Sequence, residues 1–191
     1  MAKIESTFRN MALSLTMIAL VSAALLGFVY ELTKKPIEMS VLNKKLTAIK
    51  QVVPDFTNNP NDEMFRLSAG DGDSLDIYPA KKDDVIIGYA VNTHSSKGFS
   101  GNISLMAGFR PDGTIINITV LEHKETPGLG TKMADPEFKD QFMEKDPAEF
   151  ELKVEKDGGP VDAITAAAIS SRAFCDAVQK AYNTLQKGGI K

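Results

Sequence analysis

Residues suited to binding a phosphate gather near the C-terminus, in the stretch Asp162–Arg172, DAITAAAISSR. Apolar residues recur three or four apart from about Thr165 to Gln186, which predicts a helix that starts inside this stretch. A helix N-terminus presents unpaired N–H groups and about half a unit of positive charge, so it can seat a phosphate. Three small residues, Ala166–Ala168, would let that phosphate approach the backbone. The simpler interpretation is an alanine-rich helix start, capped by Asp162 or Thr165.

A second candidate is the loop Glu122–Lys132, which contains three closely spaced turn-forming residues, Pro127, Gly128 and Gly130. Such a loop can bring backbone N–H groups and one apolar side chain, Leu129, against a flat ligand. The alternative is an ordinary tight turn that follows a strand.

The composition argues against several other kinds of site. A net charge of -3 without a basic stripe gives no reason to expect nucleic-acid binding. One cysteine, Cys175, and two histidines form no spacing typical of a disulfide or a metal site, and we expect Cys175 to be a core residue. The group Glu122, His123 and Glu125 could tune a proton. We expect these three residues to be structural or solvent-facing, and we assign no catalytic residue.

The N-terminal region predicts a membrane anchor. No residue from Asn10 to Tyr30 is charged, and at about 1.5 Å per residue this run covers a hydrocarbon core of roughly 30 Å. A cleaved signal peptide is the alternative, with Ser22-Ala23-Ala24 as the cleavage site, but the apolar run continues beyond it. The expected segments are a cytoplasmic tail at 1–9, a transmembrane helix at 10–32, a linker helix at 36–53 and an extracytoplasmic domain at 54–191.

Pro36 is expected to interrupt the N-terminal helix or to start the linker helix. The segment Pro54–Asp73 is rich in Asn, Asp, Pro and Gly, which predicts a loop. Beyond it, the β-rich segment Val85–Asn92 predicts a buried strand, and a short helix is expected over Asp135–Glu144. The resulting fold class is α+β, a transmembrane helix followed by a small domain with a mainly antiparallel sheet packed by helices.

The most specific pattern in the expected sheet is a β-hairpin. Ile103, Leu105, Ala107 and Phe109 alternate along Ser100–Phe109, and Ile116, Ile118 and Val120 alternate on the returning strand. The connecting Arg110-Pro111-Asp112-Gly113 has turn chemistry.

The stretch Asp162–Arg172 resembles the flavin-attachment sequence of a family of membrane-anchored redox proteins. The resemblance extends over Gly88–Met133, including LEHKETPGLG at Leu121–Gly130. These segments are similar to the G subunit of the Rnf ferredoxin:NAD oxidoreductase and to the C subunit of the sodium-translocating quinone reductase. The modest length favours the Rnf protein. The resemblance implies an FMN-binding domain in the cytoplasmic membrane of a bacterium, with the other Rnf subunits and the lipid bilayer as partners.

In that family a Thr carries FMN through a phosphoester bond, and a flavin transferase installs it. The corresponding residue here is Ala168, which has no hydroxyl. Three explanations remain open: an introduced Thr→Ala change, a natural relative that binds FMN non-covalently or not at all, or attachment shifted to Thr165 or Ser170. The cofactor-binding residues that the resemblance implies are Thr126, Gly128, Leu129, Gly130, Thr165, Ala167, Ala168, Ile169 and Ser170.

Three functions are compatible with these features. The first is a subunit that relays electrons through FMN in an ion-translocating ferredoxin:NAD oxidoreductase, without full activity when isolated. The second is a structural or assembly subunit in which the flavin is dispensable. The third is a stand-alone, membrane-anchored FMN-binding module of another electron-transfer chain.

Overall fold

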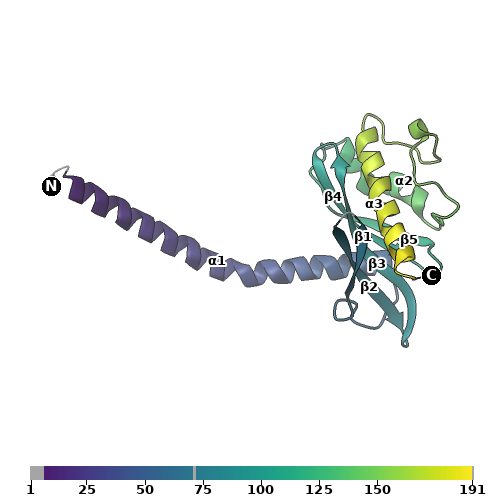
Figure 1. Cartoon of the computed structure of the whole chain (residues 1–191), viewed down its shortest axis with the longest axis horizontal. Coiled ribbons are helices and arrows are strands. Elements are labelled where there is room, and N and C mark those ends of the chain that lie inside the picture. Colours follow the sequence, from purple (N-terminus) through teal and green to yellow (C-terminus); the bar gives the residue numbers. More distant parts are fainter. Residues whose placement is uncertain (1–6, 71, 191) are drawn as a thin grey trace. The chain divides into compact units, whose positions relative to one another are not determined.

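The computed structural model describes residues 7–70 and 72–190 and divides into two compact units, 1–45 and 46–191. One α-helix, α1 (Phe8–Val52), begins in the first unit and ends in the second (Figure 1). Its apolar N-terminal part is exposed and is long enough to cross a membrane. Residues 1–6 of the expected tail lie outside the described residues.

The expected interruption at Pro36 does not occur, because α1 continues through this residue. A proline inside a helix removes one backbone hydrogen bond and crowds the carbonyl four residues earlier, but a long helix can absorb this locally. The helix-forming residues on both sides of Pro36 therefore keep this region helical. The segments expected at 10–32 and 36–53 form one helix.

The second unit is built on an antiparallel sheet in which each strand pairs with the next along the chain. Its strands are β1 (Phe65–Gly70), β2 (Asp73–Lys82), β3 (Val85–Gly98), β4 (Gly101–Phe109) and β5 (Ile115–Glu122). This arrangement confirms the expected α+β class.

The prediction of a loop over Pro54–Asp73 is partly wrong, because this segment contains β1. Phe65 and Leu67 lie two residues apart on the same face of β1 and pack against the core. They pair with Ile77 and Leu75 of β2, respectively. Pairing with a neighbouring strand stabilises β1 despite the turn-forming residues around it.

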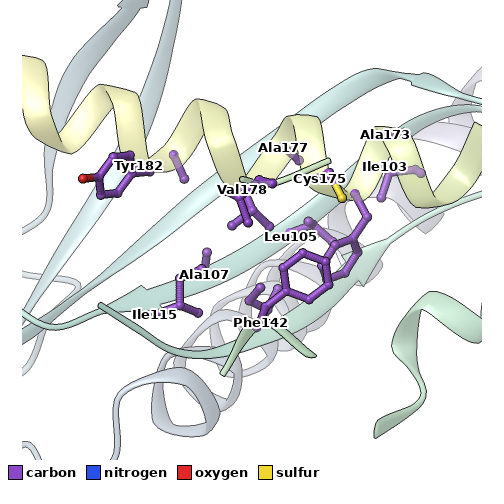
Figure 2. Packing of buried hydrophobic residues seen from close by; sticks show 14 of the residues in the cluster. Ile103, Leu105, Ala107, Ile115, Phe142, Ala173, Cys175, Ala177, Val178 and Tyr182 are labelled. Carbon is purple, nitrogen blue, oxygen red and sulfur yellow. The ribbon is translucent and has the colours of Figure 1, made fainter. Parts of the chain in front are cut away.

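The two faces of the sheet are covered by different helices. On one face lies α3 (Ala168–Lys187), and Figure 2 shows Ala173, Ala177 and Val178 of α3 in one cluster with Ile103 and Leu105 of β4.

On the other face, the last turns of α1 place Ile49 and Val52 against Tyr78 and Met106. A Cβ atom on Gly108 would lie 2.2 Å from the carbonyl oxygen of Val52. Only glycine permits this close approach of α1 to the sheet.

The predicted hairpin is confirmed by the antiparallel pairing of β4 with β5. However, Ile116 does not share a face with Ile118. The register shifts between the pairs Gly108–Asn117 and Phe109–Ile115. As a result, Ile116 packs in the cluster between the sheet and α1, and Ile115 packs in the cluster that contains α3 and Ile118. A bulge of this kind reverses the facing of the residues beyond it.

Short helical segments connect β5 to α3. They are η1 (Gly130–Ala134), α2 (Pro136–Lys139), η2 (Asp140–Phe142) and η3 (Glu155–Asp157). The helix expected over Asp135–Glu144 is thus shorter and continues as 3-10 turns. Phe138 and Phe142 are buried and contact Phe174 of α3 with ring centroids 5.2 and 5.1 Å away. This aromatic group fixes the connecting segment against α3.

Candidate functional site

An open pocket lies beside the first turn of α3, within the second unit, and has a cavity volume of about 340 Å³. We call it the α3 pocket. Its size lies within the range typical of small-molecule sites. It is lined by Phe99, Glu125, Thr126, Leu129, Gly130, Lys156, Ala166, Ala167, Ala168, Ile169 and Ser170.

The turn before α3 has an unusual backbone. Ala166 has a φ of +61°, in the left-handed region that favours glycine, and Ala167 is the N-cap of α3. Among the described residues 7–70 and 72–190, no side-chain hydrogen bond caps the start of α3, so the N–H groups of the first turn lack a side-chain cap. This turn therefore offers backbone donors to an anion beside Ala168.

The expected start of α3 at Thr165 and the expected caps are wrong. The helix begins at Ala168, and Thr165 is exposed and lines a separate, neighbouring pocket with Asp162. The backbone of Asp162 is held by Gln141, whose Oε1 accepts from the Asp162 N–H at 2.8 Å. The left-handed Ala166 breaks the helical path, so the residues before it cannot belong to the helix.

Two buried serines fix the first turn of α3. The Ser171 hydroxyl accepts from the N–H of Ile164 at 3.0 Å and donates to the carbonyl of Ala167 at 3.1 Å. The Ser170 hydroxyl donates to Oε2 of Glu125 at 2.6 Å. Ser171 therefore closes the turn before the helix, and Ser170 connects the helix to the loop after β5.

Glu125 is the central polar residue of the pocket wall. Its side chain is buried, and the whole residue is 5% exposed. Besides the bond from Ser170, its Oε1 accepts from the N–H of Ser100 at 3.0 Å, and its own N–H donates to Nδ1 of His123 at 3.3 Å. Of the two expected alternatives, structural or solvent-facing, the burial and hydrogen bonds of Glu125 agree with the structural one, and the residue also lines the pocket.

Two glycines make room for this carboxylate. A Cβ on Gly130 would lie 2.6 Å from Oγ of Ser170 and 2.7 Å from Oε2 of Glu125. A Cβ on Gly98 would lie 2.7 Å from Oε1 of Glu125. All three distances are too short for a real Cβ contact, so a side chain at either position would force the carboxylate or the Ser170 hydroxyl to move.

The loop after β5 satisfies much of its own backbone. The Gly128 N–H donates to Oγ1 of Thr131 at 3.0 Å, and the Leu129 N–H donates to the carbonyl of Thr126 at 3.2 Å. These two N–H groups are therefore occupied, contrary to the expectation that the loop offers them to a ring. The loop contributes the side chain of Leu129 instead.

The rim of the pocket is apolar and exposed. Phe99, Leu129 and Ile169 are 68%, 41% and 46% exposed, although each is a large hydrophobic residue. Ile169 stands at the start of the apolar repeat of α3 and is exposed, whereas the later members Ala173, Ala177, Ala181 and Leu185 are buried. Exposed apolar side chains around a pocket are typical of a ligand-binding or interaction site.

The two charged residues of the pocket lining are Glu125 and Lys156. Lys156 is exposed, and within residues 7–70 and 72–190 the structure shows no ion pair for it. The adjacent Asp157 instead binds Arg172 through two bonds of 2.6 and 2.8 Å, and the Arg172 guanidinium lowers the pKa of that carboxyl. Lys156 can therefore meet an anion in the pocket, whereas Arg172 is engaged.

Other reactive groups lie elsewhere. Cys175 is buried in the core as predicted, and burial raises the pKa of its thiol to about 12. No group of three or more His, Cys, Asp or Glu side chains in the described part of the chain could hold a metal ion.

The structure brings most of the predicted cofactor-binding residues together. Thr126, Leu129, Gly130 and the four residues Ala167–Ser170 line the α3 pocket, whereas Gly128 and Thr165 do not. Sequence reasoning gave no ligand-binding role to Phe99, Glu125 and Lys156, whereas Ala166 was expected to leave room for a phosphate and does line the pocket. The only available signal for Phe99 was an aromatic residue close to the glycines of a tight hairpin, Gly98 and Gly101. Nothing in the sequence marked Lys156.

Two family models match the chain. Residues 98–183 match an FMN-binding domain, a range that includes every residue lining the α3 pocket, and residues 1–52 match the N-terminal region of RnfG.

Curated relatives match over nearly their full length, and all three named below are the G subunit of an ion-translocating oxidoreductase complex. The protein from Methanosarcina acetivorans is 34% identical, over 92% of this chain and 94% of the relative. That from Pasteurella multocida is 35% identical, over 91% of each chain. That from Erwinia tasmaniensis is 31% identical, over 90% of this chain and 87% of the relative.

A solved structure shares the fold. The C subunit of the Na⁺-translocating NADH-quinone reductase from Parabacteroides distasonis matches with a TM-score of 0.57 and 19% identity, over 76% of this chain and 90% of that chain. With relatives of more than 30% identity aligned over nearly their whole length, this chain belongs to the RnfG family, the G subunits of the ion-translocating oxidoreductase complexes.

Proposed function

We propose that this chain is the G subunit of an Rnf-type complex that couples electron transfer between ferredoxin and NAD to ion translocation, and that its α3 pocket is built for FMN. The observation that carries the proposal is the pocket itself. It combines an exposed apolar rim with an uncapped helix start, inside the range that matches an FMN-binding domain. FMN has the same two parts, an apolar ring system and a phosphate, and when bound it supplies the capacity to accept and release electrons.

The residues present fit this cofactor. Phe99, Leu129 and Ile169 offer apolar surface to a flat ring system. The first turn of α3 and Lys156 offer N–H groups and a positive charge to a phosphate. The domain supplies binding and orientation, and the electrons pass to and from the other subunits of the complex.

Ala168 determines how the cofactor is held. An alanine methyl group cannot form the phosphoester that the family's Thr makes, so we propose that this chain holds FMN non-covalently or stays empty. Attachment at a neighbouring hydroxyl is disfavoured. Thr165 faces a different pocket, and the Ser170 hydroxyl is buried and bonded to Glu125. A flavin transferase would then act only on a form with Thr at position 168.

The A168T variant tests this part of the proposal. When A168T is produced together with a flavin transferase, the purified chain should show covalent flavin fluorescence on a denaturing gel, and the unaltered chain should not. T165A and S170A in the A168T background are matched controls that should keep the signal. Covalent fluorescence on the chain with Ala at position 168, together with loss of this fluorescence when Thr165 is replaced by Ala, would refute the assignment.

Isolation of the natively tagged chain from membranes tests the assignment to a complex. We expect the other Rnf subunits to co-purify, and their absence would favour a stand-alone FMN-binding module. A purely structural or assembly role makes a different prediction: the A168T complex would form and gain flavin, yet its electron transfer from ferredoxin to NAD would not change.

We also propose that the second unit lies on the extracytoplasmic side. Lys3 and Arg9 precede the apolar part of α1, and positively charged residues beside a membrane span favour the cytoplasmic side. Protease added to intact spheroplasts should cleave the second unit, and protection in spheroplasts with cleavage in inverted vesicles would contradict this orientation.

A further inference from the structure

Glu125 joins the three chain segments that form the α3 pocket. Its own segment is the loop after β5, its Oε1 accepts from the N–H of Ser100 at the β3–β4 hairpin, and its Oε2 accepts from the hydroxyl of Ser170 in α3. The Ser100 N–H and the Ser170 hydroxyl each lie within hydrogen-bond distance of one carboxylate oxygen, an arrangement that an ionised carboxylate satisfies with both oxygens. In its ionised form the side chain brings a negative charge to the pocket wall, in a place that is almost closed to water.

We propose that Glu125 is a positioning residue with an electrostatic role: it holds the three walls of the α3 pocket in place, and its charge keeps the reduction potential of the bound flavin low. The proposal rests on the proposed function, because it requires the flavin to occupy this pocket. The electrostatic part does not follow from the sequence patterns, which suggested a structural or solvent-facing Glu125.

The sign of the effect follows from electrostatics. A negative charge in a poorly solvated wall opposes the arrival of further negative charge in the pocket, so it disfavours the reduced cofactor. Two charged residues line the pocket, and Lys156 has the opposite sign. Removal of the Lys156 charge should therefore shift the potential in the opposite direction.

The side-chain geometry suggests variants that separate the two roles. E125Q keeps the length and one acceptor oxygen but removes the charge. E125D keeps the charge, but its shorter side chain cannot reach both Ser100 and Ser170. S170A keeps the charge and removes one of the two bonds. K156Q is the matched charge control, because Lys156 is exposed and has no structural ion pair among the described residues.

The experiment uses the full-length chain in detergent, in the A168T background loaded with FMN. The parent and the four variants are reduced stepwise with dithionite against a reference dye, and the flavin absorbance gives the midpoint potential. For E125Q we expect the ratio of reduced to oxidised flavin at a fixed potential to rise about tenfold, which is about +30 mV for a two-electron couple. K156Q should move to more negative potentials. E125D and S170A should keep the parent potential but lower the thermal unfolding midpoint of the flavin-free chain.

The results separate the two proposals. If the A168T parent takes up no FMN, both the proposed function and this inference fail. If the parent takes up FMN and a folded, loaded E125Q keeps the parent potential, only the electrostatic role of Glu125 is overturned. If E125Q does not fold, E125D is the deciding variant. Because E125D keeps the charge, a midpoint potential that differs from that of the parent by about 30 mV would contradict the proposal.

Discussion

Replacement of Ala166 by glycine is predicted to stabilise the second unit. Ala166 has a φ of +61°, and an L-residue in this left-handed region costs about 1–2 kcal/mol relative to glycine. Its methyl group is exposed, so its loss removes little packing. The glycine makes the unfolded chain more flexible, which lowers the free energy of unfolding by about 0.4–1 kcal/mol. The net gain is about 0.5–1 kcal/mol, or a rise in the unfolding midpoint of about 1–4 °C for a domain of this size.

The adjacent residue provides a control for this prediction. Ala167 has a φ of -134° and is 7% exposed, so A167G relieves no strain and loses a buried methyl group. Near-ultraviolet circular dichroism of the full-length chain in detergent should show a higher midpoint for A166G and a lower one for A167G. If A166G lowers the midpoint as much as A167G does, the backbone before α3 is not strained and the argument for the shape of the pocket turn is refuted.

Three further predictions concern the pocket and its surroundings. G130A should lower flavin uptake and the unfolding midpoint, since its Cβ would lie 2.6 Å from Ser170 Oγ and overpacking costs about 1–3 kcal/mol; an unchanged uptake would contradict the close packing. Arg172 lowers the pKa of Asp157, so the pair stabilises the fold above the usual Asp value of 3.8 and this stabilisation is lost as pH falls through the lowered value. R172Q should therefore have a lower urea midpoint than the parent at neutral pH but not in strong acid, and a difference that persists in acid would refute the pair. Cys175, whose pKa is raised to about 12 by burial, should resist iodoacetamide at about pH 8 until the chain is unfolded, and rapid labelling of the native chain would contradict the core position.

The fold was predictable where the sequence carried local periodicity. The hairpin of β4 and β5 and the apolar face of α3 follow from side-chain alternation and helical spacing. The strand β1 was not predictable in this way, because its pairing with β2 outweighs the turn-forming residues near it. Pro36 was misleading for a similar reason, since the helical residues on both sides keep α1 continuous.

The site was predictable in its location and less so in its chemistry. The alanine-rich turn and the loop before Gly130 are close in space, as the sequence suggested. The role of Glu125 was not visible, because burial of a carboxylate depends on Gly98 and Ser170, which are distant in the sequence. The positive φ of Ala166 was equally hidden, since an alanine gives no local indication of a left-handed turn.

The central claim is that the α3 pocket holds FMN and that Ala168 stands at its attachment position. The most direct test is intact-mass analysis with peptide mapping of the unaltered chain and A168T, each produced with a flavin transferase. The account predicts no adduct on the unaltered chain, and one FMN on A168T, on the peptide that contains residue 168. An FMN adduct on the unaltered chain, or an A168T chain without FMN at that position, would contradict it.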